Sequence, residues 1–187
     1  WDNGKNWVCG EHIDFHGPIK VTKSTVSKCD HWRVPLEILG GTVWASAYWS
    51  KPVGDSFTKY EPYPDVGYYL DWQWPRLLSD VLSCGMDSFY SPEWPFVYID
   101  WPDNGVMEDG LIAAAAIQLY ELLAAGKRVE VGCIGGHGRT GTILAAAMVL
   151  HGGFRPKDAI MWLRNAYCKE AVETLKQIEQ VYRLGHE

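Results

Sequence analysis

The sequence predicts an α/β fold in which a central, mostly parallel sheet is flanked by helices. From residue 66 onward, short apolar runs with strand character alternate with longer runs of helical periodicity, and this alternation is typical of a parallel sheet covered by helices. The chain has 187 residues, of which 47% are hydrophobic, so it is long enough for one domain with a packed core. We expect residues 1–65 to form an aromatic-rich, β-containing segment that packs on the same domain as residues 66–187.

Turn signals such as Gly40-Gly41 divide the N-terminal part into short pieces. Residues 19–27 alternate in the manner of a strand, and residues 42–49 are rich in β-branched and aromatic side chains. Nine of the ten Trp lie in residues 1–101. Aromatic side chains most often fill cores, so we expect core packing for them, with a recognition surface as the alternative.

Residues 66–187 contain the sheet and the helices of the predicted core. Pro156 opens the predicted helix 156–165, and Asp109 is the predicted N-cap of helix 110–125. Glycines follow the ends of helix 110–125 and of helix 140–151. The last helix has apolar residues at every third or fourth position. In chain order, the expected elements are strand 66–72, helix 75–83, a buried strand 96–100, helix 110–125, strand 128–131, helix 140–151, helix 156–165 and a final amphipathic helix over residues 172–182.

Composition excludes several classes of protein. With 17 basic and 23 acidic side chains the net charge is −6, which disfavours a nucleic-acid partner. The longest apolar helical stretch, residues 111–125, falls short of the roughly 20 residues that span a bilayer, so we expect no membrane partner. Five widely spaced Cys argue against a disulfide framework and for a reducing compartment, which predicts a cytoplasmic location.

The strongest functional signal lies between the strand that ends near Gly132 and the helix that begins near Arg139. The glycines of this loop let successive backbone N–H groups point into one concavity, and the helix N-terminus adds a positive field that favours a thiolate. The guanidinium of an Arg can donate hydrogen bonds to two oxygens of an anion. The pattern predicts Cys133 as a nucleophile beside a site for a tetrahedral dianion; a buried Cys in a tight turn is the alternative. The residues expected to bind this anion are Ile134, Gly135, Gly136, His137, Gly138 and Arg139.

A second motif, Trp101-Pro102-Asp103-Asn104-Gly105, follows the predicted strand 96–100. Expulsion of an alkoxide or phenolate needs a proton donor, and a carboxyl on a loop can provide it. Asp103 is therefore the predicted general acid. An ordinary turn is the alternative, because Pro, Asp, Asn and Gly are the common turn residues.

These two motifs resemble those of the protein tyrosine phosphatase superfamily, which includes the dual-specificity phosphatases. The resemblance covers about residues 66–187 and implies a mostly parallel sheet with helices on both sides. It also implies hydrolysis of phosphomonoesters through a cysteinyl-phosphate, with no cofactor and no metal. The implied substrate is a phosphorylated protein or a small phosphoester. The sequence itself leaves the oligomeric state open.

The resemblance assigns roles residue by residue. Cys133 matches the family nucleophile, Arg139 the phosphate-clamping arginine and Thr140 the hydroxyl that stabilises the leaving thiolate. Asp103 matches the acid that later acts as a base on the hydrolytic water. Gln177 is similar to the glutamine that orients this water in many members; an exposed polar position on the last helix is the alternative.

The chain departs from the family pattern in one important place. Gly132 stands where the family usually has a His, which helps to form the thiolate. This replacement favours an alternative function, a catalytically weak or inactive pseudophosphatase that binds phosphate or phosphopeptides. Asp100 is a second possible acid if the loop is arranged as in dual-specificity members.

Two further signals involve histidines. Cys9, His12 and His16 have a spacing that suits zinc, but no fourth ligand is evident, so we expect no metal there. We expect the side chain of His137 to point outward from the phosphate loop, where it would contact either substrate or solvent.

Overall fold

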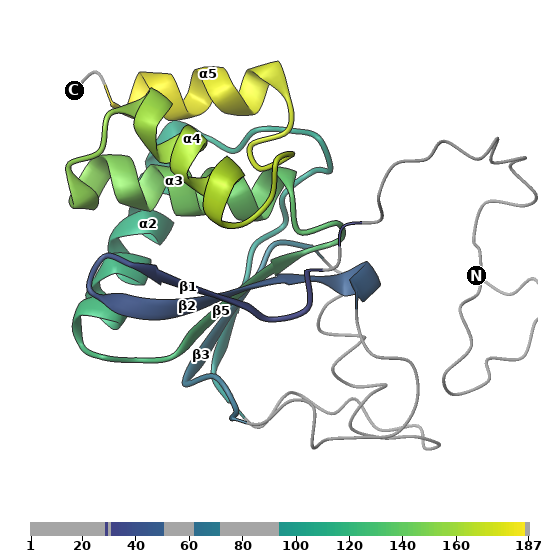
Figure 1. Cartoon of the computed structure of the whole chain (residues 1–187), viewed down its shortest axis with the longest axis vertical. Coiled ribbons are helices and arrows are strands. Elements are labelled where there is room, and N and C mark those ends of the chain that lie inside the picture. Colours follow the sequence, from purple (N-terminus) through teal and green to yellow (C-terminus); the bar gives the residue numbers. More distant parts are fainter. Residues whose placement is uncertain (1–28, 30, 51–61, 72–93, 186–187) are drawn as a thin grey trace, which may run out of the picture.

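The computed structural model describes residues 29, 31–50, 62–71 and 94–185, and within them a five-stranded sheet forms one layer, with the helices on one side of it (Figure 1). The strand order is β1-β2-β5-β3-β4. Their bounds are Val34–Ile38 for β1, Gly41–Ala47 for β2, Val66–Tyr69 for β3, Phe96–Tyr98 for β4 and Val129–Cys133 for β5. Only the β1–β2 pair is antiparallel among these strands. The predicted α/β class with a mostly parallel sheet is confirmed.

Two helices pack on the sheet and two more pack on them. Helix α2 spans Asp109–Ala124 and α3 spans Gly138–Gly152, and both contact the strands and each other. Helices α4 (Pro156–Ala166) and α5 (Leu175–Leu184) lie against α3, farther from the sheet (Figure 1). The helices that the structure describes therefore gather on one face of the sheet.

Two details of the predicted elements are wrong. The strand over residues 96–100 is not buried: Val97 and Tyr98 are 36% and 41% exposed, and among the described strands β4 lies at the edge of the sheet and pairs with β3 alone. The N-cap of α2 is Glu108 rather than Asp109, since the Glu108 carboxylate accepts the backbone N–H of Gly110. The expected strand 19–27 and helix 75–83 lie outside the described residues.

The two faces of the sheet are packed differently. On the helix side, Val129, Val131 and Cys133 of β5 join the large apolar cluster formed with α2 and α3. The intervening Glu130 is fully buried and accepts hydrogen bonds from Ser46 Oγ (2.7 Å) and Tyr69 Oη (3.1 Å). Alternation along a strand sends successive side chains to opposite faces, which explains this division.

The described Trp residues contribute to both clusters. Trp101 is 2% exposed in the large apolar cluster, and Trp94 is 5% exposed in a smaller aromatic cluster with Tyr69. The indole Nε1 of Trp94 donates to Tyr69 Oη at 2.9 Å. These two positions agree with core packing, whereas Trp1, Trp7, Trp72 and Trp74 lie outside the described residues.

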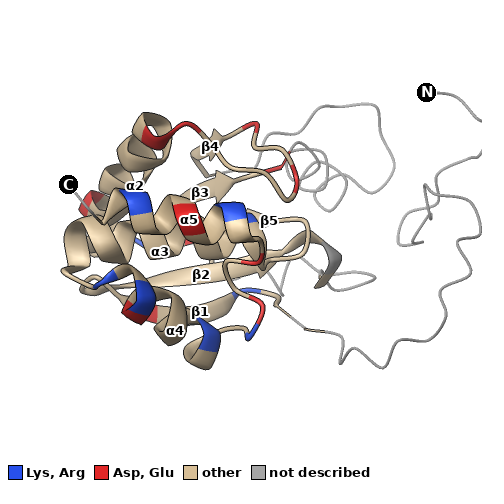
Figure 2. Ribbon diagram, turned by 90° about the horizontal axis from the view of Figure 1, so that it is seen from above, with Lys and Arg blue, Asp and Glu red and all other residues tan. Residues whose placement is uncertain are grey.

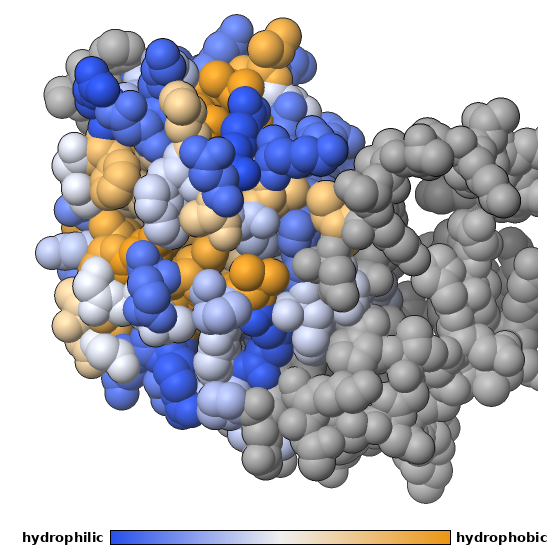
Figure 3. All heavy atoms as spheres, viewed as in Figure 1, coloured by the Kyte–Doolittle hydropathy of each residue, from blue (hydrophilic) through white to orange (hydrophobic). Residues whose placement is uncertain are grey.

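Charged and apolar side chains are mixed on the surface. Figure 2 shows acidic residues along the segment between β4 and α2, and basic residues on α4 and α5. On the face in Figure 3, hydrophobic residues lie in several small patches between hydrophilic ones. Among the described residues, no helix has the length and apolar character needed to cross a membrane.

Candidate active site

The candidate site lies where the parallel strands end. Strands β2, β3, β4 and β5 run in the same direction, so their carboxyl ends meet at one edge of the sheet. Open α/β sheets bind ligands at this edge. Cys133 is the last residue of β5, Asp71 follows β3, and the segment 101–105 follows β4.

Cys133 lies at the bottom of the loop that joins β5 to α3. Its side chain is buried, and the hydroxyl of Thr140 donates to its Sγ at 3.1 Å. Gly136 has a φ of +72°, a conformation that glycine adopts without strain, and helix α3 begins directly after the loop at Gly138. The N-terminus of this helix therefore points its positive field at the thiol.

Arg139 is 2% exposed and is held by four acceptors. Its Nη1 donates to the carbonyl oxygens of Leu70 (3.0 Å) and Trp101 (2.8 Å) and to Asp71 Oδ2 (2.8 Å). Its Nη2 donates to Asp103 Oδ1 at 2.9 Å. The guanidinium is thus anchored on one side by the ends of β3 and β4, while the other side faces the exposed carboxylate of Asp103.

The Trp-Pro-Asp segment is a compact turn. Trp101 Nε1 donates to the carbonyl oxygen of Gly105 at 3.1 Å, and the Gly105 N–H donates to that of Pro102 at 3.0 Å. Asn104 has a φ of +56°, which places Asp103 at the tip of the turn with its side chain 64% exposed. Asp100, the second possible acid, instead accepts from Tyr98 Oη at 3.4 Å and does not line the cavity described below.

Gln177 is fully buried, so an exposed position on the last helix is wrong for this residue. Its Oε1 accepts the backbone N–H groups of Glu173 and Thr174, both at 3.1 Å, and forms part of a capping box at the start of α5. Its Nε2 donates to the Gly105 carbonyl oxygen at 3.1 Å. Gln177 therefore ties α5 to the Trp-Pro-Asp segment, and its amide lies beside Gly138 of the phosphate loop.

A cavity of about 120 Å³ brings most of the predicted residues together. It is lined by Asp103, Asn104, Cys133, Ile134, Gly135, His137, Gly138, Arg139 and Glu173. The volume is about four times the roughly 30 Å³ that one water occupies in the liquid, which suits a tetrahedral anion. Thr140 and Gln177 do not line this cavity, but each lies next to a residue that does: Thr140 donates to Cys133, and the Gln177 amide lies beside Gly138.

Sequence reasoning missed Asp71, Asn104 and Glu173. Asp71 carries a usable signal, because a carboxylate directly after an apolar parallel strand lies at the same sheet edge as the end of β5. Asn104 lies beside the predicted acid. Glu173 gives no local signal, since it reaches the cavity only through the packing of α5.

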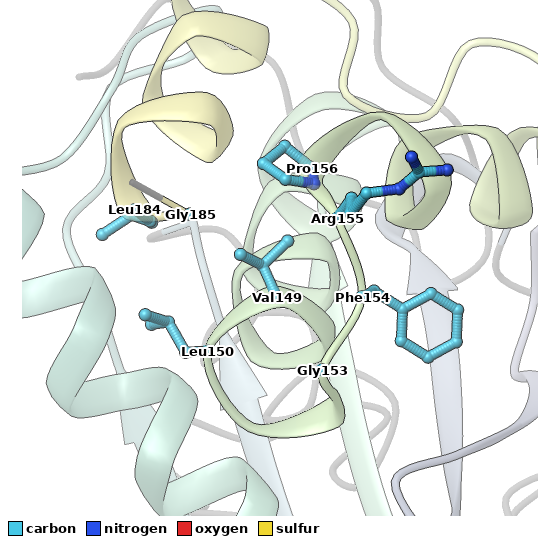
Figure 4. Close-up of a pocket in the computed structure, with 8 residues that line it drawn as sticks. All are labelled: Val149, Leu150, Gly153, Phe154, Arg155, Pro156, Leu184 and Gly185. Carbon is cyan, nitrogen blue, oxygen red and sulfur yellow. The ribbon is translucent and has the colours of Figure 1, made fainter. Parts of the chain in front are cut away.

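A larger hollow of about 280 Å³ lies between the ends of α3 and α5 and the start of α4 (Figure 4). Its one ionisable lining side chain, Arg155, pairs with Asp158 at 2.6 Å. None of the lining residues is a nucleophile or an acid. We therefore place the chemistry in the smaller cavity, where Cys133 and Asp103 meet.

The side chain of His137 does not point outward as predicted. Its Nδ1 lies 3.2 Å from Cys168 Sγ, and its ring makes an edge contact with His31. Beside it, Tyr167 Oη donates to the carbonyl oxygen of Gly136 at 2.7 Å. Burial raises the pKa of Tyr167 well above its ordinary value, so this hydroxyl keeps the proton that it donates to the phosphate loop.

Comparisons with solved structures show which known fold the chain has. Tk-PTP in its active form is 21% identical, with a TM-score of 0.60 over 79% of this chain and 92% of that one. Kinase associated phosphatase (KAP) is 17% identical over 79% and 88% of the two chains, with a TM-score of 0.58. DUSP15 is 11% identical over 83% and 89%, with a TM-score of 0.60. The chain has the fold of the tyrosine and dual-specificity phosphatases, as its motifs predicted.

Within this fold, the chain belongs to the same family as MJECL20 of Methanocaldococcus jannaschii, a protein described as uncharacterized. The two are 36% identical over 114 residues, which cover 60% of this chain and 70% of the relative. MJ0215 of the same organism, also described as uncharacterized, is 36% identical over 114 residues, or 65% of its length. No protein-family model matches the sequence.

Proposed function

We propose that the protein is a metal-independent phosphomonoester hydrolase that acts through a cysteinyl-phosphate. The observation that carries this proposal is the meeting of Cys133, Arg139 and Asp103 around one cavity. A nucleophile, an anion clamp and a proton donor are the groups that phosphomonoester hydrolysis needs. The phosphatase-like fold supports the same class of reaction.

In the first step, the Cys133 thiolate attacks phosphorus, and the bond from phosphorus to the leaving oxygen breaks as the S–P bond forms. Asp103 gives its proton to the leaving oxygen. Without substrate, the Asp103 carboxylate accepts a hydrogen bond from Arg139 Nη2. A phosphoryl group in the cavity competes for Nη2 and releases this carboxylate, which takes up a proton from solvent before it acts as the acid. Nη1 keeps its three protein acceptors, so the guanidinium stays oriented while it binds the phosphate.

In the second step, water attacks phosphorus and the S–P bond breaks. Asp103 takes the proton of the water, and the thiolate returns. The hydroxyl of Thr140, already 3.1 Å from Sγ, stabilises the departing sulfur by donating to it. Gln177 is placed to hold the Trp-Pro-Asp turn through Gly105; the role of orienting water requires its amide to leave the contacts that it now makes.

The test is hydrolysis of an aryl phosphate without added metal. We expect vanadate to inhibit it, Cys133→Ser to abolish it, and Asp103→Asn to reduce turnover by about 10²–10⁴-fold, the usual contribution of a general acid. Asp100→Asn is the matched control, because this neighbouring carboxylate lies outside the cavity, and it should retain activity. Full activity in Cys133→Ser would refute the mechanism.

The substrate class can be sought with the same variants. Asp103→Asn should hold its substrate without releasing the leaving group, so it serves as a trap against a panel of phosphopeptides and phosphorylated metabolites. We expect the trapped compound to be a phosphorylated protein or a small phosphoester. Ile134, Gly135 and His137 occupy loop positions where phosphoinositide-directed members often carry Lys, which favours these two classes.

Gly132 supports a second candidate, a phosphate-binding pseudophosphatase. Its carbonyl oxygen accepts the Leu70 N–H at 2.8 Å, so this position serves strand pairing and offers no side chain to the thiol. This candidate predicts phosphate or phosphopeptide binding that Arg139→Ala abolishes, with no phosphorylated Cys133. Trapping a cysteinyl-phosphate on the wild-type protein by rapid acid quench would eliminate it.

A further inference from the structure

Four metal-ligating side chains meet behind the phosphate loop. Cys29, His31, His137 and Cys168 each offer one ligand atom, and these four atoms all lie within 4.8 Å of one another. His137 Nδ1 lies 3.2 Å from Cys168 Sγ, and the two sulfurs are 3.9 Å apart. The residues come from three separate parts of the chain, so only the tertiary structure brings them together.

These distances suit one tetrahedral zinc ion. Zn–S bonds of about 2.3 Å and Zn–N bonds of about 2.0–2.1 Å place two sulfurs about 3.8 Å apart and a sulfur and a nitrogen about 3.6 Å apart in a tetrahedron. The observed separations of 3.9 Å and 3.2 Å lie within a few tenths of an ångström of these values. Two thiolates and two imidazoles are also a common ligand set of structural zinc.

The charges of the four ligands and their burial also favour a zinc ion. Two thiolates balance the two positive charges of zinc and the imidazoles remain neutral, so the loaded site carries no net charge into the interior. His31 and Cys168 are each 5% exposed, whereas Cys29 and His137 are half-buried. Four protein ligands fill the coordination sphere, which is the pattern of a structural site rather than of a catalytic one.

The surroundings hold the ligands in place. The backbone N–H of Glu170 donates to Cys168 Sγ at 3.4 Å, a contact that stabilises a thiolate. The backbone N–H of His31 donates to Ser50 Oγ at 3.0 Å, and the backbone carbonyl oxygen of His31 accepts the Ala47 N–H at 2.9 Å. These two contacts fix the backbone that carries the His31 ring.

We propose that Cys29, His31, His137 and Cys168 bind one structural Zn²⁺ that fixes the phosphate loop. His137 belongs to the loop that cradles the anion and also lines the cavity with Cys133. The zinc therefore fastens this loop to the segment before β1 and to the segment after α4. This site does not rest on the proposed phosphatase activity, since zinc binding needs neither the attack by Cys133 nor the proton of Asp103.

The test is metal content after expression in zinc-containing medium and purification under reducing conditions. Mass spectrometry of metals should find one zinc per chain in the wild type and in Cys133→Ser, and less than a tenth of that in Cys29→Ser and Cys168→Ser. Cys133→Ser removes the proposed nucleophile but no ligand, so failure of the phosphatase proposal leaves the zinc count unchanged. Cys9→Ser is a second control, which tests the Cys9, His12 and His16 spacing separately and should keep its zinc.

Cobalt replacement keeps the test decisive if a variant fails to fold. Wild-type protein stripped with a chelator and reloaded with Co²⁺ should show the strong visible bands of a tetrahedral ion and the charge-transfer absorption of two thiolates. Zinc that persists in Cys168→Ser, or that is lost in Cys9→Ser, would overturn the assignment. So would a stoichiometric metal other than zinc, or a wild-type protein that contains no metal.

Discussion

Asp71 gives the sharpest test of how Arg139, the proposed phosphate-binding arginine, is held. Asp71 and Arg139 form an ion pair at 2.8 Å whose two side chains are 6% and 2% exposed. At an effective dielectric constant of about 20, two unit charges at this separation attract by about 6 kcal/mol. Asp71→Ala removes this attraction and leaves the Arg139 charge buried, but it also removes the cost of taking the carboxylate out of water, which offsets part of the loss.

We therefore expect Asp71→Ala to lower the free energy of unfolding by about 3–5 kcal/mol, the usual cost of breaking a buried pair. Asp71→Asn keeps an acceptor for Nη1 and should cost about 1–3 kcal/mol. The assay is urea unfolding at neutral pH, in which the midpoint and the slope are fitted together. In a double-mutant cycle with Arg139→Met, the double variant should be more stable than Asp71→Ala alone.

Asp158→Ala is the matched control. The Asp158–Arg155 pair is shorter, at 2.6 Å, but its side chains are 40% and 83% exposed. Exposed pairs contribute about 0–1 kcal/mol, so this variant should unfold close to the wild type. If Asp71→Ala cost no more than Asp158→Ala, burial would not be the source of the stabilisation and the reasoning would be refuted.

Three other changes have defined outcomes. Gly136→Ala should lower the free energy of unfolding by about 1–3 kcal/mol in urea titrations, because φ is +72° and the new Cβ would lie 2.8 Å from Tyr167 Oη; an unchanged midpoint would contradict this. Gln177→Ala should cost about 1–3 kcal/mol by leaving buried polar groups unpaired, and should also slow aryl phosphate hydrolysis; wild-type stability would argue against its bridging role. The Arg183 guanidinium holds the pKa of Asp109 below its ordinary 3.8, so the stabilisation by this carboxylate is present above about pH 4 and is lost as the pH falls through the lower, folded-state pKa. Asp109→Asn should accordingly remove about 0.5–1 kcal/mol at pH 7 and flatten the acid limb of the stability profile, and a difference from wild type that does not shrink below pH 4 would contradict this.

The elements with strong local signals were predictable. Helix α4 begins at Pro156 and α3 ends near Gly152, as proline and glycine placement indicated. The strand with Cys133 at its end and the helix after it were also predictable, because an apolar run, a glycine-rich turn and a helical run follow each other without interruption. Local conformation decides these features.

The wrong predictions concern the burial of β4, the N-cap of α2 and the exposure of Gln177. The β4 run has strand character, but its burial depends on whether a strand pairs with its far side, and among the described strands only β3 pairs with it. Glu108 caps α2 instead of Asp109 because the chain enters the helix one residue earlier than expected. Gln177 lies in a polar stretch of α5, and its burial follows from the position of the Trp-Pro-Asp turn.

The sequence by itself determined the α/β class and the glycine-rich turn between the strand that ends at Cys133 and the helix that contains Arg139, and it predicted that Asp103 acts as the acid. These depend on residues that are close in the chain, whose turn, helix and charge properties are local. Only the tertiary structure decided that Asp71 anchors Arg139 and that His137 joins Cys29, His31 and Cys168. These contacts join residues far apart in sequence, and they exist because strand order and helix packing carry distant segments to one edge of the sheet.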